Sequence, residues 1–131
     1  MTKKIALITG VSGQDGAYLA KFLLKKNYKV IGVERRSARS NNWRLEKLNI
    51  EGKIIIEDLD IKEINNIIRI FSKYKINEVY NLAAQSFVQS SFHNPIETSQ
   101  VNAIGVLNLL EVIRNQKRKI KFYQASTSEM F

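Results

Sequence analysis

The chain has 131 residues, of which 44% are hydrophobic and 25% charged, and these values are ordinary for one globular domain. It contains no cysteine and one histidine, His93, which excludes a disulfide scaffold and a metal site built from thiolates or several histidines. The net charge of +9 raises the possibility of a nucleic-acid partner, but the lysines are scattered at expected helix ends and turns, so solvated faces account for most of them.

Strand-like and helix-like segments alternate along the chain. Short apolar runs that end at turns are typical of buried parallel strands, and apolar residues at a spacing of three and four are typical of helices. We expect strands at 4–9, 28–34, from 54, 78–82 and 120–126, and helices at 15–26, 60–74 and from Pro95. This order predicts an α/β fold with a Rossmann-type doubly wound parallel sheet in three layers, truncated after about the fifth strand.

The apolar spacing also predicts which face of each helix is buried. For the first helix we expect a core face of Ala17, Leu19, Ala20, Leu23 and Leu24. For the helix at 60–74 the expected face is Ile61, Ile64, Ile67, Ile68 and Phe71. For the helix that begins at Pro95 it is Val101, Ile104, Leu107, Leu110 and Ile113.

A glycine-rich segment joins the first strand to the first helix. Its glycines are spaced Gly-x-x-Gly-x-x-Gly, which permits a tight turn, close approach of the backbone to a pyrophosphate, and close packing of helix on strand. The N–H groups at the start of the helix would face the phosphates. We therefore expect a dinucleotide cofactor here, bound by Gly10, Val11, Ser12, Gly13, Gln14, Asp15 and Gly16, the alternative being a plain glycine turn.

The end of the second strand bears on the choice of cofactor. Glu34 stands where an acidic residue would bind the adenosine ribose 2′-hydroxyl and select NAD. Arg35, Arg36 and Ser37 follow at once, and guanidinium groups with a hydroxyl suit the 2′-phosphate of NADP. We expect NADP, bound by these three residues, the alternative being that the arginines form a solvated loop.

Two further strand ends would meet the cofactor. Asp58 and Leu59 close the third strand beside the expected adenine site, where Asp58 could also cap the next helix. Leu82, Ala83 and Ala84 follow the fourth strand, where small residues let the backbone lie against the cofactor or simply pack closely.

Three motifs together carry a family resemblance. They are the glycine turn, Asn81-Leu82-Ala83-Ala84-Gln85-Ser86, and Tyr123-Gln124-Ala125-Ser126-Thr127-Ser128-Glu129. With them the chain resembles the extended short-chain dehydrogenase/reductase superfamily and, within it, the GDP-mannose 4,6-dehydratases. The resemblance implies NADP held by Gly10 to Asp15, by Arg35 and its neighbours, by Asp58 and Leu59, and by Leu82, Ala83, Ala84, Gln85 and Ser86.

The resemblance also implies that Thr127 and Glu129 are catalytic. Alternation along an extended segment places both side chains on one side, at the carboxyl end of the fifth strand. Glu129 would remove the proton from C5 of a 4-keto hexose and assist loss of the C6 hydroxyl, while Thr127 would hydrogen-bond the C4 oxygen. The alternative is a strand-end hydroxyl cluster beside a surface carboxylate. The chain departs from the family at Glu34 and Glu97, and it ends before the family's Tyr-x-x-x-Lys pair.

The resulting expectation is an enzyme of the hydro-lyase class. Residues 1–131 would form an incomplete NADP-binding domain, inactive alone, of a protein that converts GDP-mannose to GDP-4-keto-6-deoxymannose. We expect a cytoplasmic homo-oligomer, a dimer or tetramer, with a nucleotide-sugar substrate and with no metal, nucleic-acid or membrane partner. The alternatives are a GDP-heptose 4,6-dehydratase, another nucleotide-sugar epimerase or reductase, and a bare dinucleotide-binding fragment.

Overall fold

A five-stranded parallel sheet runs through the computed structural model, which describes residues 3–34, 43–82 and 95–124. The strand order is β3-β2-β1-β4-β5. The strands are β1 (Ile5–Thr9), β2 (Lys29–Glu34), β3 (Ile55–Asp58), β4 (Glu78–Asn81) and β5 (Lys121–Gln124). The helices are α1 (Gln14–Lys25), α2 (Trp43–Lys47), the short 3₁₀ helix η2 (Glu51–Lys53), α3 (Ile64–Lys73) and α4 (Pro95–Arg114).

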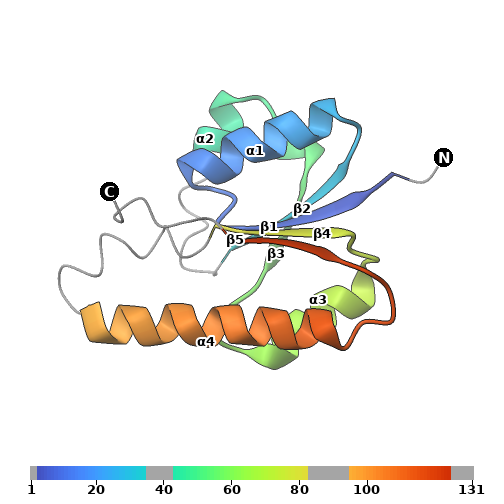
Figure 1. Ribbon diagram of the computed structural model, residues 1–131. Helices are drawn as coiled ribbons and strands as arrows, with labels where there is room; N and C mark the ends of the chain where they lie inside the picture. The colour runs from blue at the N-terminus through green and yellow to red at the C-terminus, as the bar shows by residue number, and fades with distance from the viewer. Residues whose placement is uncertain (1–2, 35–42, 83–94, 125–131) are drawn as a thin grey trace.

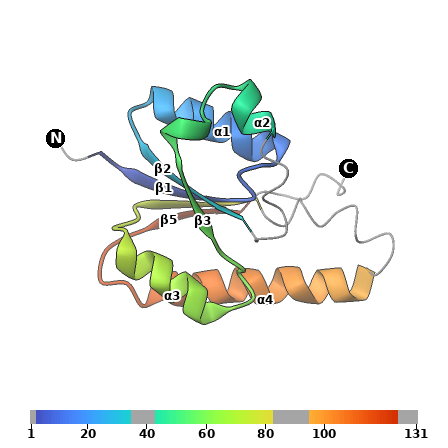
Figure 2. The same ribbon diagram turned by 180° about the vertical axis from the view of Figure 1, so that it is seen from behind.

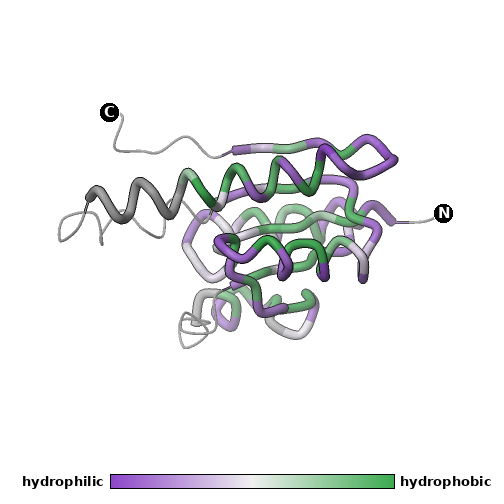
Figure 3. Tube along the Cα trace, turned by 90° about the horizontal axis from the view of Figure 1, so that it is seen from below, coloured by the Kyte–Doolittle hydropathy of each residue, from purple (hydrophilic) through white to green (hydrophobic). Residues whose placement is uncertain are grey.

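The helices form two layers, one on each face of the sheet. Both α1 and α2 lie on one face, and α3 and α4 lie on the other, as the front and back views show (Figure 1, Figure 2). Apolar residues dominate the strands and polar residues the turns (Figure 3). The expected three-layer parallel α/β fold, with the expected alternation of strands and helices, is confirmed.

Helix α1 packs on the sheet through the face that its spacing predicts. Ala17, Ala20 and Leu23 are buried, and Leu19 and Leu24 are partly buried in the same cluster. Small residues in the first two turns let the helix lie close to the strands, which holds its N-terminus near the end of β1.

Helix α3 begins at Ile64, four residues later than predicted, because a turn precedes it. The N–H of Glu63 donates to the carbonyl oxygen of Asp60 at 2.9 Å, and the N–H of Lys62 donates to the Asp60 carboxylate at 3.0 Å. Of the expected core face, Ile67 and Phe71 are buried and Ile64 packs against the same cluster. The prediction for Ile68 was wrong, because its side chain is exposed and Ile70 is buried instead.

Helix α4 starts at Pro95, as predicted, but it presents a different face to the sheet. Ile104, Leu107 and Leu110 are 47%, 65% and 41% exposed, so the expectation that they belong to the core was wrong. Where the structure describes the burial of α4, from residue 103 onward, the buried positions are Gly105, Leu109 and Val112. Ile113 packs against the cluster of Leu109 and Val112, and the side chain of Val101 lies outside the described residues.

Contacts with the segment before α3 explain this orientation of α4. Gly105 faces Ile61 so closely that a Cβ would stand 2.5 Å from Ile61 Cγ1. Asn108 donates from Nδ2 to the carbonyl oxygens of Ile61 and Lys62, at 2.9 and 3.0 Å. Leucine and isoleucine occur on both sides of α4, so periodicity alone does not distinguish its faces, whereas a glycine and an asparagine at the contact do.

Candidate functional site

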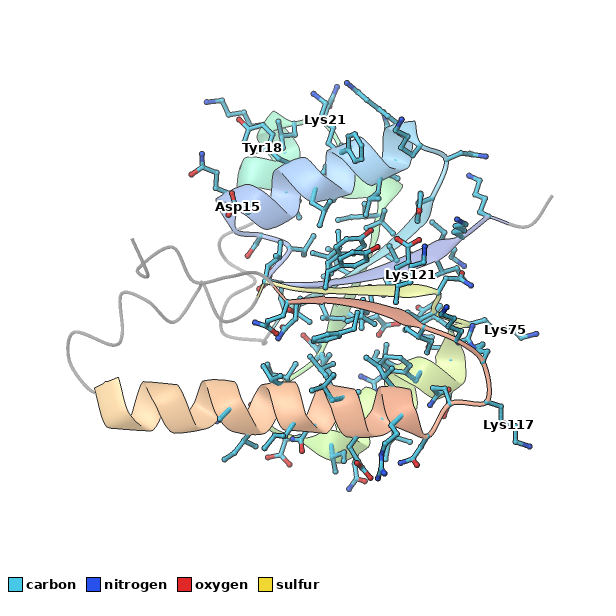
Figure 4. All side chains as sticks on the ribbon, in the orientation of Figure 1. Asp15, Tyr18, Lys21, Lys75, Lys117 and Lys121 are labelled. Carbon is cyan, nitrogen blue, oxygen red and sulfur yellow. The ribbon has the colours of Figure 1, made fainter. Side chains whose placement is uncertain are left out.

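The carboxyl ends of the strands meet at one edge of the sheet, and the candidate site lies there. Asp15, at the start of α1, marks this edge, and Lys75, Lys117 and Lys121 lie at the opposite edge (Figure 4). Ligands of open parallel sheets bind outside the carboxyl ends of the strands. The site is therefore built from the residues that end β1, β2, β3, β4 and β5.

The turn after β1 is tight, as predicted. Gly10 has a φ of 71°, a conformation that residues with a side chain rarely adopt. Its N–H donates to the carbonyl oxygen of Val33 at 3.2 Å, and the N–H of Gly13 donates back to Gly10 at 3.1 Å. The chain thus reverses within four residues and enters α1.

Two glycines keep the space around this turn free of side chains. A Cβ on Gly16 would stand 2.8 Å from Val11 Cα and closer still to the Gly10 carbonyl oxygen. A Cβ on Gly32 of β2 would stand 2.6 Å from Val11 Cγ1. The turn is therefore in contact with α1 on one side and with β2 on the other, with no room for extra atoms.

The start of α1 has no cap from a side chain. Its N-cap is Gly13, and the first helical bond is made by the N–H of Ala17 to Gly13 at 2.9 Å. The N–H groups of Gln14, Asp15 and Gly16 therefore point out of the helix end, where the helix dipole favours an anion. Gln14 and Asp15 are exposed, so an anion can reach these groups from solvent. The arrangement fits the diphosphate of a dinucleotide.

Glu34 lies directly beside the turn. Its carboxylate accepts a hydrogen bond from the N–H of Ser12, and both residues are buried, at 7% and 6% exposure. Asp58 is the in-register neighbour of Glu34 on β3, and the N–H of Leu59 donates to the Glu34 carbonyl oxygen at 3.0 Å. The structure thus brings Asp58 and Leu59 next to Glu34 and the turn, although the Leu59 side chain is buried in the core on the α3–α4 face.

A row of polar side chains crosses the ends of β1, β4 and β5. Thr9 donates from Oγ1 to Oδ1 of Asn81 at 2.5 Å, and Asn81 donates from Nδ2 to Oε1 of Gln124 at 2.8 Å. Leu82 donates its N–H to Oγ1 of Thr9 at 3.0 Å. Sequence reasoning did not assign this row. Its signal in the sequence was that Asn81 and Gln124 belong to two of the motifs that carry the family resemblance.

The structure describes the positions of only part of the predicted site. It brings together Gly10 to Gly16, Asp58, Leu59 and Leu82 at one edge of the sheet. The remaining predicted site residues lie outside the described residues, namely Arg35, Arg36, Ser37, Ala83, Ala84, Gln85, Ser86, Thr127 and Glu129.

The described ranges contain neither a candidate metal site nor a candidate membrane-spanning helix. Within them, no group of three or more histidine, cysteine, aspartate or glutamate side chains is placed to hold a metal ion. No helix in the same ranges combines the length and the apolar character needed to cross a membrane.

The strand order and the glycine turn define an α/β domain with a Rossmann-like fold. The sequence profile of the family described as "GDP-mannose 4,6 dehydratase" matches residues 7–131. The chain belongs to this family.

Relatives in distant organisms share the similarity along almost the whole chain. Proteins named GDP-mannose 4,6-dehydratase or GDP-mannose 4,6 dehydratase are 48% identical in Vibrio cholerae serotype O1, 43% in Drosophila melanogaster and 42% in Homo sapiens. These alignments cover 98–100% of this chain. The chain spans only 34–37% of the length of these relatives.

Solved structures share the fold over most of this chain. An epimerase of Methanothermobacter thermautotrophicus, Mth375, superposes with a TM-score of 0.79 at 28% identity, covering 96% of this chain and 36% of its own. A UDP-glucose 4-epimerase of Bifidobacterium longum, solved with NAD+ and UDP, gives a TM-score of 0.73 at 26% identity and covers 95% of this chain and 37% of its own.

Proposed function

We propose that this chain is the dinucleotide-binding portion of a nucleotide-sugar 4,6-dehydratase that converts GDP-mannose to GDP-4-keto-6-deoxymannose. The observation that carries the proposal is the family match over residues 7–131. The geometry of the glycine turn supports it, because a dehydratase of this kind needs a bound nicotinamide dinucleotide and the turn offers a seat for its diphosphate.

The cofactor of this proposal is NADP. Backbone N–H groups of Gln14 to Gly16 would hold the diphosphate, and Asp58 would lie near the adenine. Arg35, Arg36 and Ser37 follow β2 directly, and two guanidinium groups with a hydroxyl match a 2′-phosphate. NAD is the alternative, since the Bifidobacterium longum epimerase was solved with NAD+.

The catalytic residues of this proposal are Thr127 and Glu129. The nicotinamide, when bound, would supply a two-electron oxidation at C4 of the hexose and, after water is lost, the matching two-electron reduction at C6, so that no outside oxidant is consumed. Glu129 takes the C5 proton, which the C4 ketone makes acidic, and assists the C6 hydroxyl to leave as water. Thr127 donates a hydrogen bond to the C4 oxygen and fixes its position. A well-placed base of this kind is worth about 10²–10⁴-fold in rate.

The remaining parts of the enzyme are expected outside these 131 residues. The substrate domain and the Tyr-x-x-x-Lys pair would follow residue 131, in keeping with the 37% of its length that this chain covers in the Vibrio cholerae relative. We expect the 131-residue chain to be inactive alone, and the full-length protein to act in the cytoplasm as a dimer or tetramer.

Turnover of GDP-mannose by the full-length gene product tests this proposal. We expect loss of one water and a 4-keto product, both detected by mass spectrometry. Glu129→Gln should lower the rate of water loss about 10²–10⁴-fold while C4 oxidation remains detectable. Glu46→Gln, at an exposed position of α2, serves as the control and should not change the rate.

Two results would contradict the proposal in different ways. Undiminished water loss by Glu129→Gln would remove Glu129 from the mechanism. A 4-keto product formed by the 131-residue chain alone would show that no downstream residue is needed.

A nucleotide-sugar 4-epimerase is the second candidate. The two solved structures described above that share this fold are those of an epimerase and a UDP-glucose 4-epimerase, at 26–28% identity. An epimerase returns the C4 hydrogen without losing water, so it needs no base at position 129. A product of unchanged mass with an inverted C4 centre would favour this candidate.

A further inference from the structure

Glu34 carries a buried carboxylate at the end of β2. It ends β2 at 7% exposure, beside the seat proposed for the diphosphate. Burying a carboxylate is costly unless hydrogen bonds stabilise the charge. The contacts of Glu34 therefore indicate what its side chain does.

The carboxylate of Glu34 supports the turn from its buried side. It accepts a hydrogen bond from the N–H of Ser12, which is itself 6% exposed. The exposed side of the same turn is formed by Gln14 and Asp15, at the open start of α1. The bond thus lies behind the turn, and the N–H groups offered to a ligand lie in front of it.

Strand β2 supports the turn at two further points. The N–H of Gly10 donates to the carbonyl oxygen of Val33 at 3.2 Å, and Gly32 leaves just enough space for the side chain of Val11. Gly32, Val33 and Glu34, three consecutive residues of β2, thus contact Val11, Gly10 and Ser12 of the turn. The contact of Glu34 is the one of these three that reaches Ser12.

We infer that Glu34 is a positioning residue that holds the glycine turn in shape for the diphosphate, and that it does not select between NAD and NADP. The inference rests on the proposed function, because it assumes that the turn seats a nicotinamide dinucleotide. It explains how an acidic residue can stand before Arg35 and Arg36 without opposing a 2′-phosphate.

The test is the affinity of the full-length gene product for NAD and for NADP, measured by isothermal titration calorimetry on protein freed of bound cofactor. Glu34→Gln keeps an oxygen acceptor for the Ser12 N–H at the same reach and removes the charge. We expect both dissociation constants to stay within about threefold and their ratio to be unchanged. Glu34→Leu removes the acceptor and should weaken both dinucleotides together, by about 10- to 100-fold.

Hydrogen exchange of the Ser12 amide gives an independent readout. It should remain slow in the wild type and in Glu34→Gln and become faster in Glu34→Leu. Glu46→Gln is the matched control on an exposed part of α2 and should change neither affinity nor exchange. If Glu34→Leu does not fold, the ratio measured for Glu34→Gln still decides the question.

Two results would overturn the inference. One is a change of ten-fold or more, in favour of NADP, in the ratio of the two dissociation constants of Glu34→Gln. That change would mean that Glu34 contacts the ribose and selects between the two cofactors. The other is a folded Glu34→Leu variant with both affinities unchanged. Failure of the wild type to bind either dinucleotide would instead refute the proposed function.

Discussion

Replacing Gly16 by alanine tests whether close packing of α1 on the glycine turn shapes the seat. A Cβ at this position would stand 2.8 Å from Val11 Cα, where ordinary contact begins at 3.4 Å. The turn and the helix must therefore part by at least 0.6 Å, the difference of these two distances. The obstructing atoms belong to the backbone, so no rotation of a side chain relieves the contact.

The expected cost follows from two opposing effects. Overpacking of a rigid site costs about 1–3 kcal/mol, whereas alanine gains about 0.5–1 kcal/mol over glycine within a helix. The Cβ is fixed to the backbone of the helix and would meet backbone atoms of the turn. We therefore expect the clash to dominate, with a net loss of about 2 kcal/mol in the free energy of unfolding. For a chain of this size that loss lowers the melting temperature by roughly 8 °C.

Urea unfolding followed by circular dichroism measures this loss. Gly52→Ala is the matched control, because a Cβ on Gly52 meets nothing within 4 Å and its stability should change by less than about 0.5 kcal/mol. If Gly16→Ala were as stable as Gly52→Ala, the packing of helix on turn would not be close and the reasoning about the seat would fail.

Three further predictions concern the rest of the fold. On α4, Leu109→Ala should lose about 2–5 kcal/mol in urea unfolding and Leu107→Ala less than about 0.5, and equal losses would contradict the orientation of the helix. The hydrogen bond and ion pair from Lys73 at 2.8 Å, together with the hydroxyl of Tyr74, lower the pKa of Glu57 below its ordinary value of 4.5. Because a lowered pKa stabilises the fold above pH 4.5 and this stabilisation is lost as the pH falls through the lowered pKa, Glu57→Gln should cost up to about 1 kcal/mol at pH 7 and progressively less below pH 4.5; a difference that stays constant as the pH falls would refute it. Asn81→Leu should speed hydrogen exchange in β5 but not in β2, and unchanged exchange in β5 would show that Asn81 does not hold this strand.

The alternation of strands and helices could be predicted because each local pattern agrees with the fold. The glycine turn could also be predicted, since the spacing of Gly10, Gly13 and Gly16 has few other uses after a buried strand. The buried face of α4 could not, because Leu107 and Leu109 are equally apolar and the contacts of Gly105 and Asn108 with Ile61 distinguish them. Those contacts join segments more than forty residues apart, beyond the reach of periodicity.

The polar contacts at the strand ends escaped prediction for a related reason. Thr9, Asn81 and Gln124 fall in three separate expected strands, and nothing in their spacing links them. They become one row only when β1, β4 and β5 stand side by side in the register Thr9 with Asn81 and Asn81 with Gln124. The position of Glu34 in the sequence predicts a contact with the ribose 2′-hydroxyl, whereas its contact with Ser12 is visible only in three dimensions.

The Asn81–Gln124 bond has a consequence for the alignment of β5. This strand has four residues with only one side chain partly buried and none fully buried, so burial of apolar surface does little to prevent it from slipping along β4. The bond from Asn81 and the stacking of Tyr80 on Tyr123, with ring centroids 4.7 Å apart, pin it instead. A slip by one residue would exchange the two faces of the strand. These two contacts thereby hold β5 in register with β4, Tyr80 beside Tyr123 and Asn81 beside Gln124.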